Sequence, residues 1–256
     1  KEGTASGAWH KVPGSSNLVY EGQFNDGMPD FNLQSVLDDP DGNLATEMKN
    51  VMKFWLIDHD VDGFRLDAVT SYFTGNQAKN IEYLTWLKNE ATKLKEDVYI
   101  VGEGSWGSNA AENKTYQASG VDSFFNFANR SLEPSYSIPS IISGKDASYL
   151  ATNMINSWDT ASTGIPANFI ANHDIGRLVG SVGGRKDIVK AKLGHSLLGI
   201  LPGAIYNYYG DEVGQAVPTN KLGDPDIRLH VEWGDSYVTQ DPPGAVSDYA
   251  MSTTYP

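Results

Sequence analysis

The segment Asp62-Gly-Phe-Arg-Leu-Asp67 alternates apolar and charged residues, the pattern of a β-strand with one buried face. Before it, apolar residues recur at three- and four-residue spacing and predict a helix from Thr46 to Asp58; they are Met48, Val51, Met52, Trp55 and Leu56. After it, we predict a second helix from Asn80 to Lys95 and a strand from Val98 to Glu103. Strands joined by helices are typical of a parallel sheet.

The second half of the chain continues this alternation. We predict strands over Ser123–Phe127, Asn168–Asn172 and Ala204–Tyr209, and helices over Ala147–Trp158 and Lys186–Leu198. By contrast, the first 30 or so residues are rich in Gly, Ser, Asn and Pro and show no sustained periodicity. We therefore expect an α/β domain that is preceded by a loop-rich segment.

The spacing of three acidic residues matches the length of these strand–helix units. Asp67 and Glu103 are 36 positions apart, about one unit, and Asp174 follows after another 71, about two units. The three acids therefore fall at the C-terminal ends of strands, which form the catalytic face of a (β/α)₈ barrel. An open doubly wound sheet gives similar spacing, so the periodicity alone does not separate these two architectures.

Asp67 is the first candidate catalytic residue. Strand pleating places Arg65 and Asp67 on one face and Phe64 and Leu66 on the other. In a partly buried site, a neighbouring guanidinium favours the ionised carboxylate that a nucleophile needs. An ordinary buried Arg–Asp ion pair would give the same pattern, so this segment alone leaves both interpretations open.

Glu103 and Asp174 occupy equivalent places. Glu103 follows the apolar run Tyr99-Ile-Val-Gly102, and apolar surroundings favour the protonated carboxyl that a proton donor needs. Asp174 ends Asn172-His-Asp174 after another predicted strand. Each alone could be a structural residue at a strand end. Together, three acids on one repeat satisfy the requirement of glycoside cleavage for at least two flanking carboxylates.

Several other residues near these points have two interpretations. Five aromatic residues could stack on sugar rings or fill the core and loops, namely Trp9, Tyr20, Phe24, Trp106 and Tyr208. We assign Phe24 and Trp106 to substrate binding. The pair Asp211-Glu212 could bind substrate or cap the following turn.

Composition excludes several classes of function. The formal charge of −13 argues against a nucleic-acid partner, which requires a basic surface. The absence of cysteine excludes disulfides, thiolate zinc sites and a cysteine nucleophile. No run of apolar residues approaches the 18 or so that span a membrane. With 28 aromatic residues (13 Tyr, 9 Phe and 6 Trp), the acidic chain suits a neutral polar ligand such as a sugar.

Three motifs resemble those of the α-amylase family of glycoside hydrolases. Gly63-Phe-Arg-Leu-Asp-Ala-Val69 is similar to the family's nucleophile motif, and Val101-Gly-Glu103 is similar to its acid/base motif. Phe169-Ile-Ala-Asn-His-Asp174 resembles the motif that carries a substrate-binding histidine and a third acid. Two lesser stretches agree, Met28-Pro-Asp-Phe-Asn32 and Ala204 to Gly214, and the motifs follow the family's order and spacing from about Trp9 to Gly214.

The resemblance implies a retaining hydrolase of α-1,4-linked glucans that acts by double displacement. It implies Asp67 as nucleophile, Glu103 as acid/base and Asp174 as the third acid, with Arg65 and His173 binding substrate or holding the site. Ala68, directly after the nucleophile, resembles the α-1,4-acting members. The implied partner is an α-glucan oligosaccharide or polysaccharide, with no nucleic acid and no membrane. Two alternatives stay open: an α-glucosidase or transglycosylase of the same family, or a catalytically silent glucan-binding fragment.

The chain departs from the family pattern in what it lacks. The family's first conserved motif is absent, nothing before Met28 supplies three strand–helix units, and no C-terminal β-sandwich follows. Leu229 stands after Asp226-Ile-Arg228 where the family commonly has glutamate. We therefore expect part of a (β/α)₈ barrel, whose partner is the remainder of the enzyme. Its expected divisions are a loop-rich segment over 1–30, a barrel portion over 31–214 and an irregular segment over 215–256.

The resemblance also sets expectations about cofactors and location. The chemistry requires no cofactor, and no metal ligand is identified. A structural calcium ion is compatible with the family, but its usual ligands are not in this chain. The resemblance implies a secreted, extracellular enzyme of bacterial type, although the chain carries no signal peptide.

Overall fold

The computed structural model describes residues 3–104, 110–129, 137–144, 146, 148, 151–152, 155, 164–178, 188–215 and 227–228. The chain divides into two compact units. Unit 1 comprises Lys1–Gly104 with Ala118–Asp122, and unit 2 comprises Ser105–Gln117 with Ser123–Pro256. Each unit is built around parallel strands.

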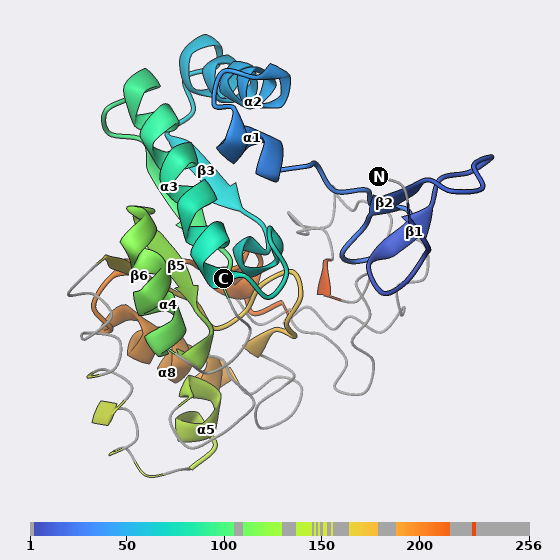
Figure 1. Cartoon of the computed structure of the whole chain (residues 1–256). Coiled ribbons are helices and arrows are strands. Elements are labelled where there is room, and N and C mark those ends of the chain that lie inside the picture. The colour runs from blue at the N-terminus through green and yellow to red at the C-terminus, as the bar shows by residue number, and fades with distance from the viewer. Residues whose placement is uncertain are drawn as a thin grey trace, which may run out of the picture. The chain divides into compact units, whose positions relative to one another are not determined.

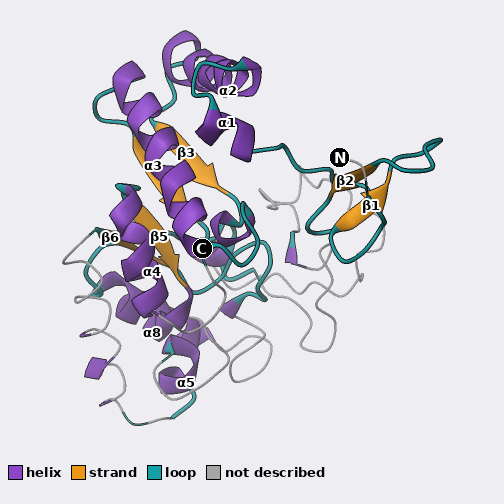
Figure 2. Cartoon of the chain, viewed as in Figure 1, coloured by secondary structure: helices purple, strands orange, loops and turns teal. Residues whose placement is uncertain are grey.

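In unit 1 the predicted strands and helices are confirmed. Strand β3 (Gly63–Leu66) pairs in parallel with β4 (Tyr99–Gly102), from Gly63 opposite Tyr99 to Leu66 opposite Gly102. Helix α3 (Gln77–Leu94) connects them, and α2 (Asn43–Lys53) precedes β3 and continues as a π-helical turn, Phe54–Asp58 (Figure 2). This register brings the C-terminal ends of both strands to the same edge.

Helix α3 is fastened to β4 by a polar link beside the apolar core. The core of unit 1 includes Val36 of α1 (Gln34–Asp38), Ala45 and Tyr83. The Lys88 ammonium donates to the carbonyl of Val98 (2.7 Å) and pairs with Asp122 (2.6 Å). The Asp122 carboxylate also accepts the Ile100 amide at 2.8 Å. The start of β4 is therefore bound to α3, the helix that precedes it in the chain.

The prediction of an irregular N-terminal segment was wrong for two short stretches. Trp9–Lys11 (β1) and Val19–Glu21 (β2) form an antiparallel ladder (Figure 1). Each strand has three residues, which is too few for a period-two pattern to stand out among the surrounding turn-forming residues. The rest of the segment is turn and loop in the described residues.

Unit 2 contains three parallel strands in sequence order. Strands β5 (Ser123–Asn126), β6 (Ile165–Asn168) and β7 (Ala204–Ile205) pair in turn. Its helices are α4 (Ala110–Tyr116), α5 (Ile138–Ile142) and α8 (Ile188–Gly199), of which α8 confirms a prediction. Short 3₁₀ turns occupy Phe127–Asn129 and Asp211–Val213 in unit 2, Val69–Ser71 in unit 1 and Gln117–Ser119 where the chain passes from unit 2 to unit 1.

Two predicted strands of unit 2 were misplaced or too long. The ladder of β6 ends at Asn168, where the prediction began, although Phe169, Ile170 and Ala171 are buried. These residues are apolar because they pack in the core, and an apolar run does not distinguish core packing from strand pairing. The last strand has two residues in place of the predicted six, and the predicted helix over Ala147–Trp158 lies mostly outside the described residues.

The outer strands have open edges within the described part of the chain. There β3 pairs with β4 alone and β7 with β6 alone, so the strands do not close into a barrel. The apolar stripe predicted around α2 is only half covered: Met52 and Leu56 are buried, whereas Val51 and Trp55 are 52% and 45% exposed. No described helix combines the length and apolar character needed to cross a membrane.

The parallel register predicts that alanine is not tolerated at Gly63. A methyl group there would overlap the carbonyl of Tyr99 and force β3 away from β4. We expect Gly63→Ala to lower the free energy of unfolding by about 3 kcal/mol, the upper range for overpacking, measured by urea denaturation. Gly199→Ala is the control, because nothing lies within 4 Å of a methyl group there. Equal stability of the two variants would contradict the register.

Candidate active site

The C-terminal end of β3 carries Arg65 and, directly after the strand, Asp67. The Arg65 Nη1 contacts Asp67 Oδ1, as the predicted common face requires. One expectation was wrong: the Asp67 side chain is 71% exposed instead of partly buried. Asp67 also lines the same pocket as Phe64 and Leu66, because the strand ends at Leu66 and its pleat no longer directs Asp67.

Glu103 follows β4 and is the buried member of the carboxylate pair. Its side chain is 6% exposed, and its Oε2 lies 3.2 Å from Arg65 Nη2 and accepts the Ala68 amide at 3.1 Å. The backbone of Glu103 donates to Leu66 (2.8 Å) and accepts from Val69 (2.9 Å). Both the main chain and the side chain of Glu103 are thus joined to the segment around Asp67.

Ala68 adopts a left-handed backbone conformation, with φ of 42° and ψ of 47°. For a residue with a Cβ this conformation costs on the order of 1–2 kcal/mol and requires compensation from its surroundings. Here the turn aims the Ala68 amide at Glu103, which accepts it. The residue after the candidate nucleophile therefore has a structural role that no sequence pattern predicted.

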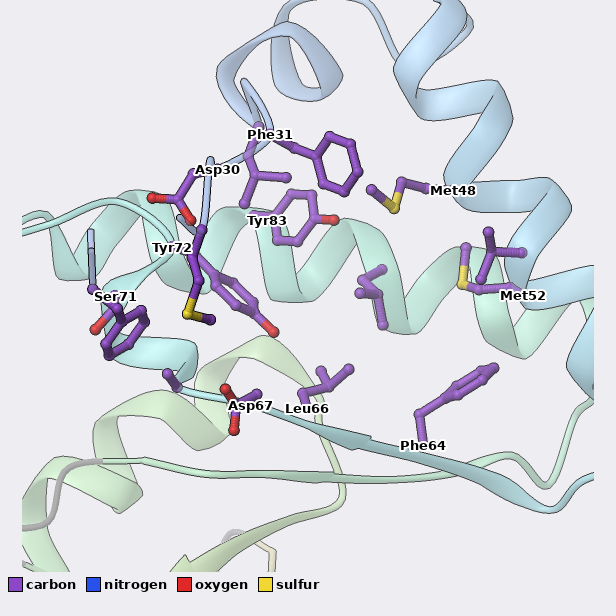
Figure 3. A pocket seen from close by; sticks show the side chains of 16 residues that line it. Asp30, Phe31, Met48, Met52, Phe64, Leu66, Asp67, Ser71, Tyr72 and Tyr83 are labelled. Atoms are coloured by element: carbon purple, nitrogen blue, oxygen red, sulfur yellow. The ribbon is translucent and has the colours of Figure 1, made fainter. Parts of the chain in front are cut away.

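A pocket of about 410 Å³ lies against Asp67, and apolar side chains form most of its wall. Figure 3 shows Ser71 and Tyr72 on the side of the cavity near Asp67, with Phe64 and Met52 at the other end. Phe24, predicted to bind substrate, also lines it.

Burial keeps a phenol protonated beside Asp67. It raises the pKa of Tyr72 far above its usual value, and nearby Tyr83 and Asp67 raise it further. Burial also raises the pKa of Tyr83 to about 12. Both hydroxyl groups therefore stay protonated, and able to donate a hydrogen bond, even at an alkaline pH at which a free phenol ionises.

Unit 2 contains a second polar group, formed by Asn172, His173, Asp174 and Arg228. The Asn172 side chain accepts the Asp174 amide at 2.9 Å, and His173 Nε2 lies 3.0 Å from Asp174 Oδ2. Arg228 donates to the other oxygen, Asp174 Oδ1, and to the His173 carbonyl, both at 2.9 Å. Asp174 is thus held through both carboxylate oxygens.

Arg228 was not predicted as a site residue. It is 54 positions from Asp174, and the sequence singled out Asp226-Ile-Arg228 only because Leu229 follows it. No local pattern in a single sequence indicates that two residues so far apart are in contact. The contact depends on the tertiary structure of unit 2.

The structure places Asp211 in the core of unit 2, with Tyr208 packed against its arginine partner. Asp211 pairs with Arg177 at 3.0 Å, and both side chains are almost fully buried. The Arg177 guanidinium lies 4.4 Å from the ring centre of Tyr208, whose hydroxyl donates to the Ile227 carbonyl at 2.9 Å. Substrate binding by Asp211 and sugar stacking by Tyr208 do not fit these contacts.

The remaining predicted site residues are less informative. In unit 1, Tyr20 packs against His10, with 5.6 Å between ring centres. Trp106 lies outside the described residues. Within the described ranges, no three His, Asp or Glu side chains gather in a way that could hold a metal ion.

The chain is similar to known proteins over most of its length. Residues 6–240 match the family model described as alpha amylase, catalytic domain. Alpha-amylase 3 of Dictyoglomus thermophilum is 32% identical over 90% of this chain and 42% of its own length. A 4-alpha-glucanotransferase of Thermotoga neapolitana is 29% identical over 80% of this chain and 41% of its own length.

A solved structure, Eubacterium rectale Amy13B, is 33% identical and superposes with a TM-score of 0.80. The match covers 95% of this chain and 47% of that protein. The chain therefore spans less than half the length of each of these relatives. The fold is that of the α-amylase catalytic (β/α)₈ barrel, of which the described strands form an unclosed part.

The shared guanidinium predicts a measurable coupling between Arg65 and Glu103. Arg65→Met leaves the buried Glu103 carboxylate without its cation. We expect a loss of roughly 2 kcal/mol in the free energy of unfolding, less than for a fully buried pair because Arg65 is one-third exposed. Adding Glu103→Gln should recover part of this loss in a double-mutant cycle followed by urea denaturation.

Lys95→Met provides the matched control for the loss of a cation. Lys95 pairs with the exposed Asp60 and Asp62, which precede β3, the strand that carries Arg65. Ion pairs with exposed carboxylates contribute about 0–1 kcal/mol to the free energy of unfolding. Additive effects of Arg65→Met and Glu103→Gln would show that the two side chains do not interact.

Proposed function

Because this chain belongs to the α-amylase family of glycoside hydrolases, we propose that it carries the nucleophile and the acid/base of a retaining hydrolase of α-1,4-linked glucans. The observation that carries the proposal is the contact of one guanidinium, that of Arg65, with the carboxylates of both Asp67 and Glu103. Such a pair at the ends of adjacent parallel strands is the minimum that glycoside cleavage requires.

In the proposed first step, Asp67 attacks the anomeric carbon while the protonated Glu103 donates its proton to the glycosidic oxygen. The bond from that carbon to the leaving oxygen breaks, and a glycosyl ester forms on Asp67. In the second step Glu103, now a carboxylate, takes a proton from water, which attacks the same carbon and releases Asp67. Arg65 orients both carboxylates throughout, and the exposure of Asp67 leaves it accessible to a sugar.

Retention is favoured over inversion by how closely the two carboxylates approach. Retaining enzymes hold them about 5–5.5 Å apart, whereas inverting enzymes need about 6.5–9.5 Å to admit a water molecule. Adjacent nitrogens of one planar guanidinium contact an oxygen from each carboxylate, which favours the shorter separation. Direct attack by Asp67 is therefore the better-supported route.

We propose a supporting role for the second polar group. In the complete enzyme, Asp174 and His173 would bind sugar hydroxyl groups more tightly as the oxocarbenium character develops. Arg228 and His173 each occupy one oxygen of Asp174, so the carboxylate has a defined orientation before substrate binds. This preorganisation avoids a reorientation during the reaction.

Hydrolysis and transfer differ only in the acceptor that attacks the glycosyl ester, water or a second sugar. One relative is named an α-amylase and another a glucanotransferase, so the family assignment includes both reactions. We propose α-1,4 hydrolysis because of Ala68, with α-glucosidase and transglycosylase activities as the alternatives. Chromatography of the products from maltooligosaccharides, with and without added acceptor, distinguishes them: longer products indicate transfer.

The partner that we propose, apart from glucan, is the remainder of a longer polypeptide. The chain covers less than half of its relatives, β3 has an open edge among the described strands, and Val51 and Trp55, on the helical segment that precedes β3, are exposed. Unpaired strand edges and exposed apolar residues are normally covered by further structure. If the chain acts only as a glucan-binding fragment, it will bind maltooligosaccharides without releasing reducing ends.

The nucleophile assignment predicts that Asp67→Asn abolishes turnover in the active polypeptide. The amide keeps the shape of the side chain but cannot form the glycosyl ester. We expect at least a 10³-fold fall in kcat, measured by release of reducing sugar from maltooligosaccharides, with an unchanged unfolding midpoint. A 5-fluoro glycosyl fluoride should label wild type at Asp67, as detected by peptide mass spectrometry.

Asp62→Asn is the matched control, since Asp62 lies ahead of the same strand, far from its C-terminal end, and its exposed side chain pairs with Lys95. It should retain activity within about twofold. Activity of Asp67→Asn within tenfold of wild type, or a label on another residue, would remove Asp67 from the role of nucleophile.

A further inference from the structure

The segment from Ala68 to Phe73 connects the proposed nucleophile to helix α3, and its first part is bound to Glu103. The amide of Ala68 donates to the Glu103 side chain and that of Val69 to the Glu103 carbonyl. Ser71 donates back to the Ala68 carbonyl at 2.8 Å. The path of this segment therefore determines whether Glu103 receives its backbone hydrogen bonds.

The other end of the segment is held by the side chain of Asn80. Its Oδ1 accepts the Phe73 amide at 2.6 Å, and its Nδ2 donates to the Thr70 carbonyl at 2.9 Å. Asn80 is only 1% exposed although it lies within the first turns of α3. Asparagine is a poor helix former and is costly to bury without partners, so these two hydrogen bonds explain its presence there.

Ser71 and Tyr72, the two residues between these attachment points, line the same pocket as Asp67 (Figure 3). Only a group that donates and accepts at once can bind both Thr70 and Phe73. A carboxylate lacks the donor, and an apolar side chain of the same size lacks both.

We propose that Asn80 is a positioning residue for the two carboxylates. By holding Thr70 and Phe73, it keeps Ala68 in its left-handed turn with the amide directed at Glu103, and keeps Asp67 at the pocket wall. The inference rests on the proposed glycosidase function, in which Asp67 and Glu103 react. Asn80 acts through the backbone of residues 68–73, to which both of its side-chain hydrogen bonds attach.

The test uses Asn80→Asp and Asn80→Leu in the active polypeptide, with hydrolysis of a chromogenic α-maltotrioside as the assay. At neutral pH both variants should lower kcat on the order of 10²-fold, the cost of misplacing a reacting group by about 1 Å, with KM within threefold. A purely structural role would lower the unfolding midpoint but leave kcat unchanged wherever the protein is folded.

The pH dependence supplies a signature of the hydrogen-bond pattern. The introduced carboxyl is buried, which raises its pKa, and in its neutral form it both donates and accepts as the amide does. The ratio of kcat in Asn80→Asp to kcat in wild type should therefore rise as the pH falls. The charged and titratable groups around the segment, Arg65, Asp67, Glu103 and Tyr72, are present in all three proteins, so Asn80→Leu supplies the baseline for the effect of misplacing them. Asn80→Leu should show no such rise.

Asn113→Leu is the matched control. Asn113 is also a buried helix asparagine, in α4 of unit 2, and its Nδ2 donates to the Phe125 carbonyl at 3.1 Å. This variant should lose stability and keep its kcat. Folded Asn80→Leu with kcat within threefold of wild type, or an Asn80→Asp ratio that does not change with pH, would overturn the proposal.

Amide hydrogen exchange separates this inference from the proposed function. If Asn80 holds the segment, exchange at Phe73 and Ala68 is faster in Asn80→Leu than in wild type, whether or not the protein cleaves glucans. Unchanged exchange at both amides overturns the positioning role. Absence of glucan cleavage by wild type, together with faster exchange in the variant, would overturn the proposed function and leave the structural link standing.

Discussion

The arrangement of the site depends on one guanidinium with a carboxylate on each side. Arg65 comes from β3, Asp67 follows the same strand, and Glu103 follows the neighbouring strand. Without the cation, the buried Glu103 would face a second acidic group across the strand ends, and two carboxylates at close range repel each other. The arginine therefore permits the two acids to be close, which is the condition for double displacement.

The parallel register of β3 and β4 brings the side chains of Arg65, Asp67 and Glu103 together at the C-terminal ends of the two strands. Gly63 opposite Tyr99 sets the register at the start of the strands, and Leu66 opposite Gly102 carries it to the end. Because Gly63 has no Cβ, β3 and β4 can approach closely enough for the backbones of Leu66 and Val69 to form hydrogen bonds with the backbone of Glu103. A steric constraint at one end of the ladder thus supports the chemistry at the other.

In unit 2 another arginine holds an aspartate by an ion pair. Arg228 holds Asp174, as Arg65 holds Asp67, and His173 completes the set. Arg177 and Asp211 form a further pair, but theirs is buried beneath Tyr208 and stabilises the core. The three arginine–aspartate pairs differ in exposure, and exposure separates residues that can meet a substrate from those that cannot.

The sequence by itself determined the alternation of strands and helices, the acids at the ends of β3 and β4 and the family, because these follow from local periodicity, spacing and contiguous motifs. Only the tertiary structure decided which distant groups meet: Arg228 with Asp174, Asn80 with the segment after Asp67, and Arg177 with Asp211. It also decided where pairing stops, since the buried Phe169 is as apolar as a strand residue yet lies beyond β6. Periodicity records which side chains are buried, whereas hydrogen-bond partners across tens of residues depend on how the chain folds back on itself.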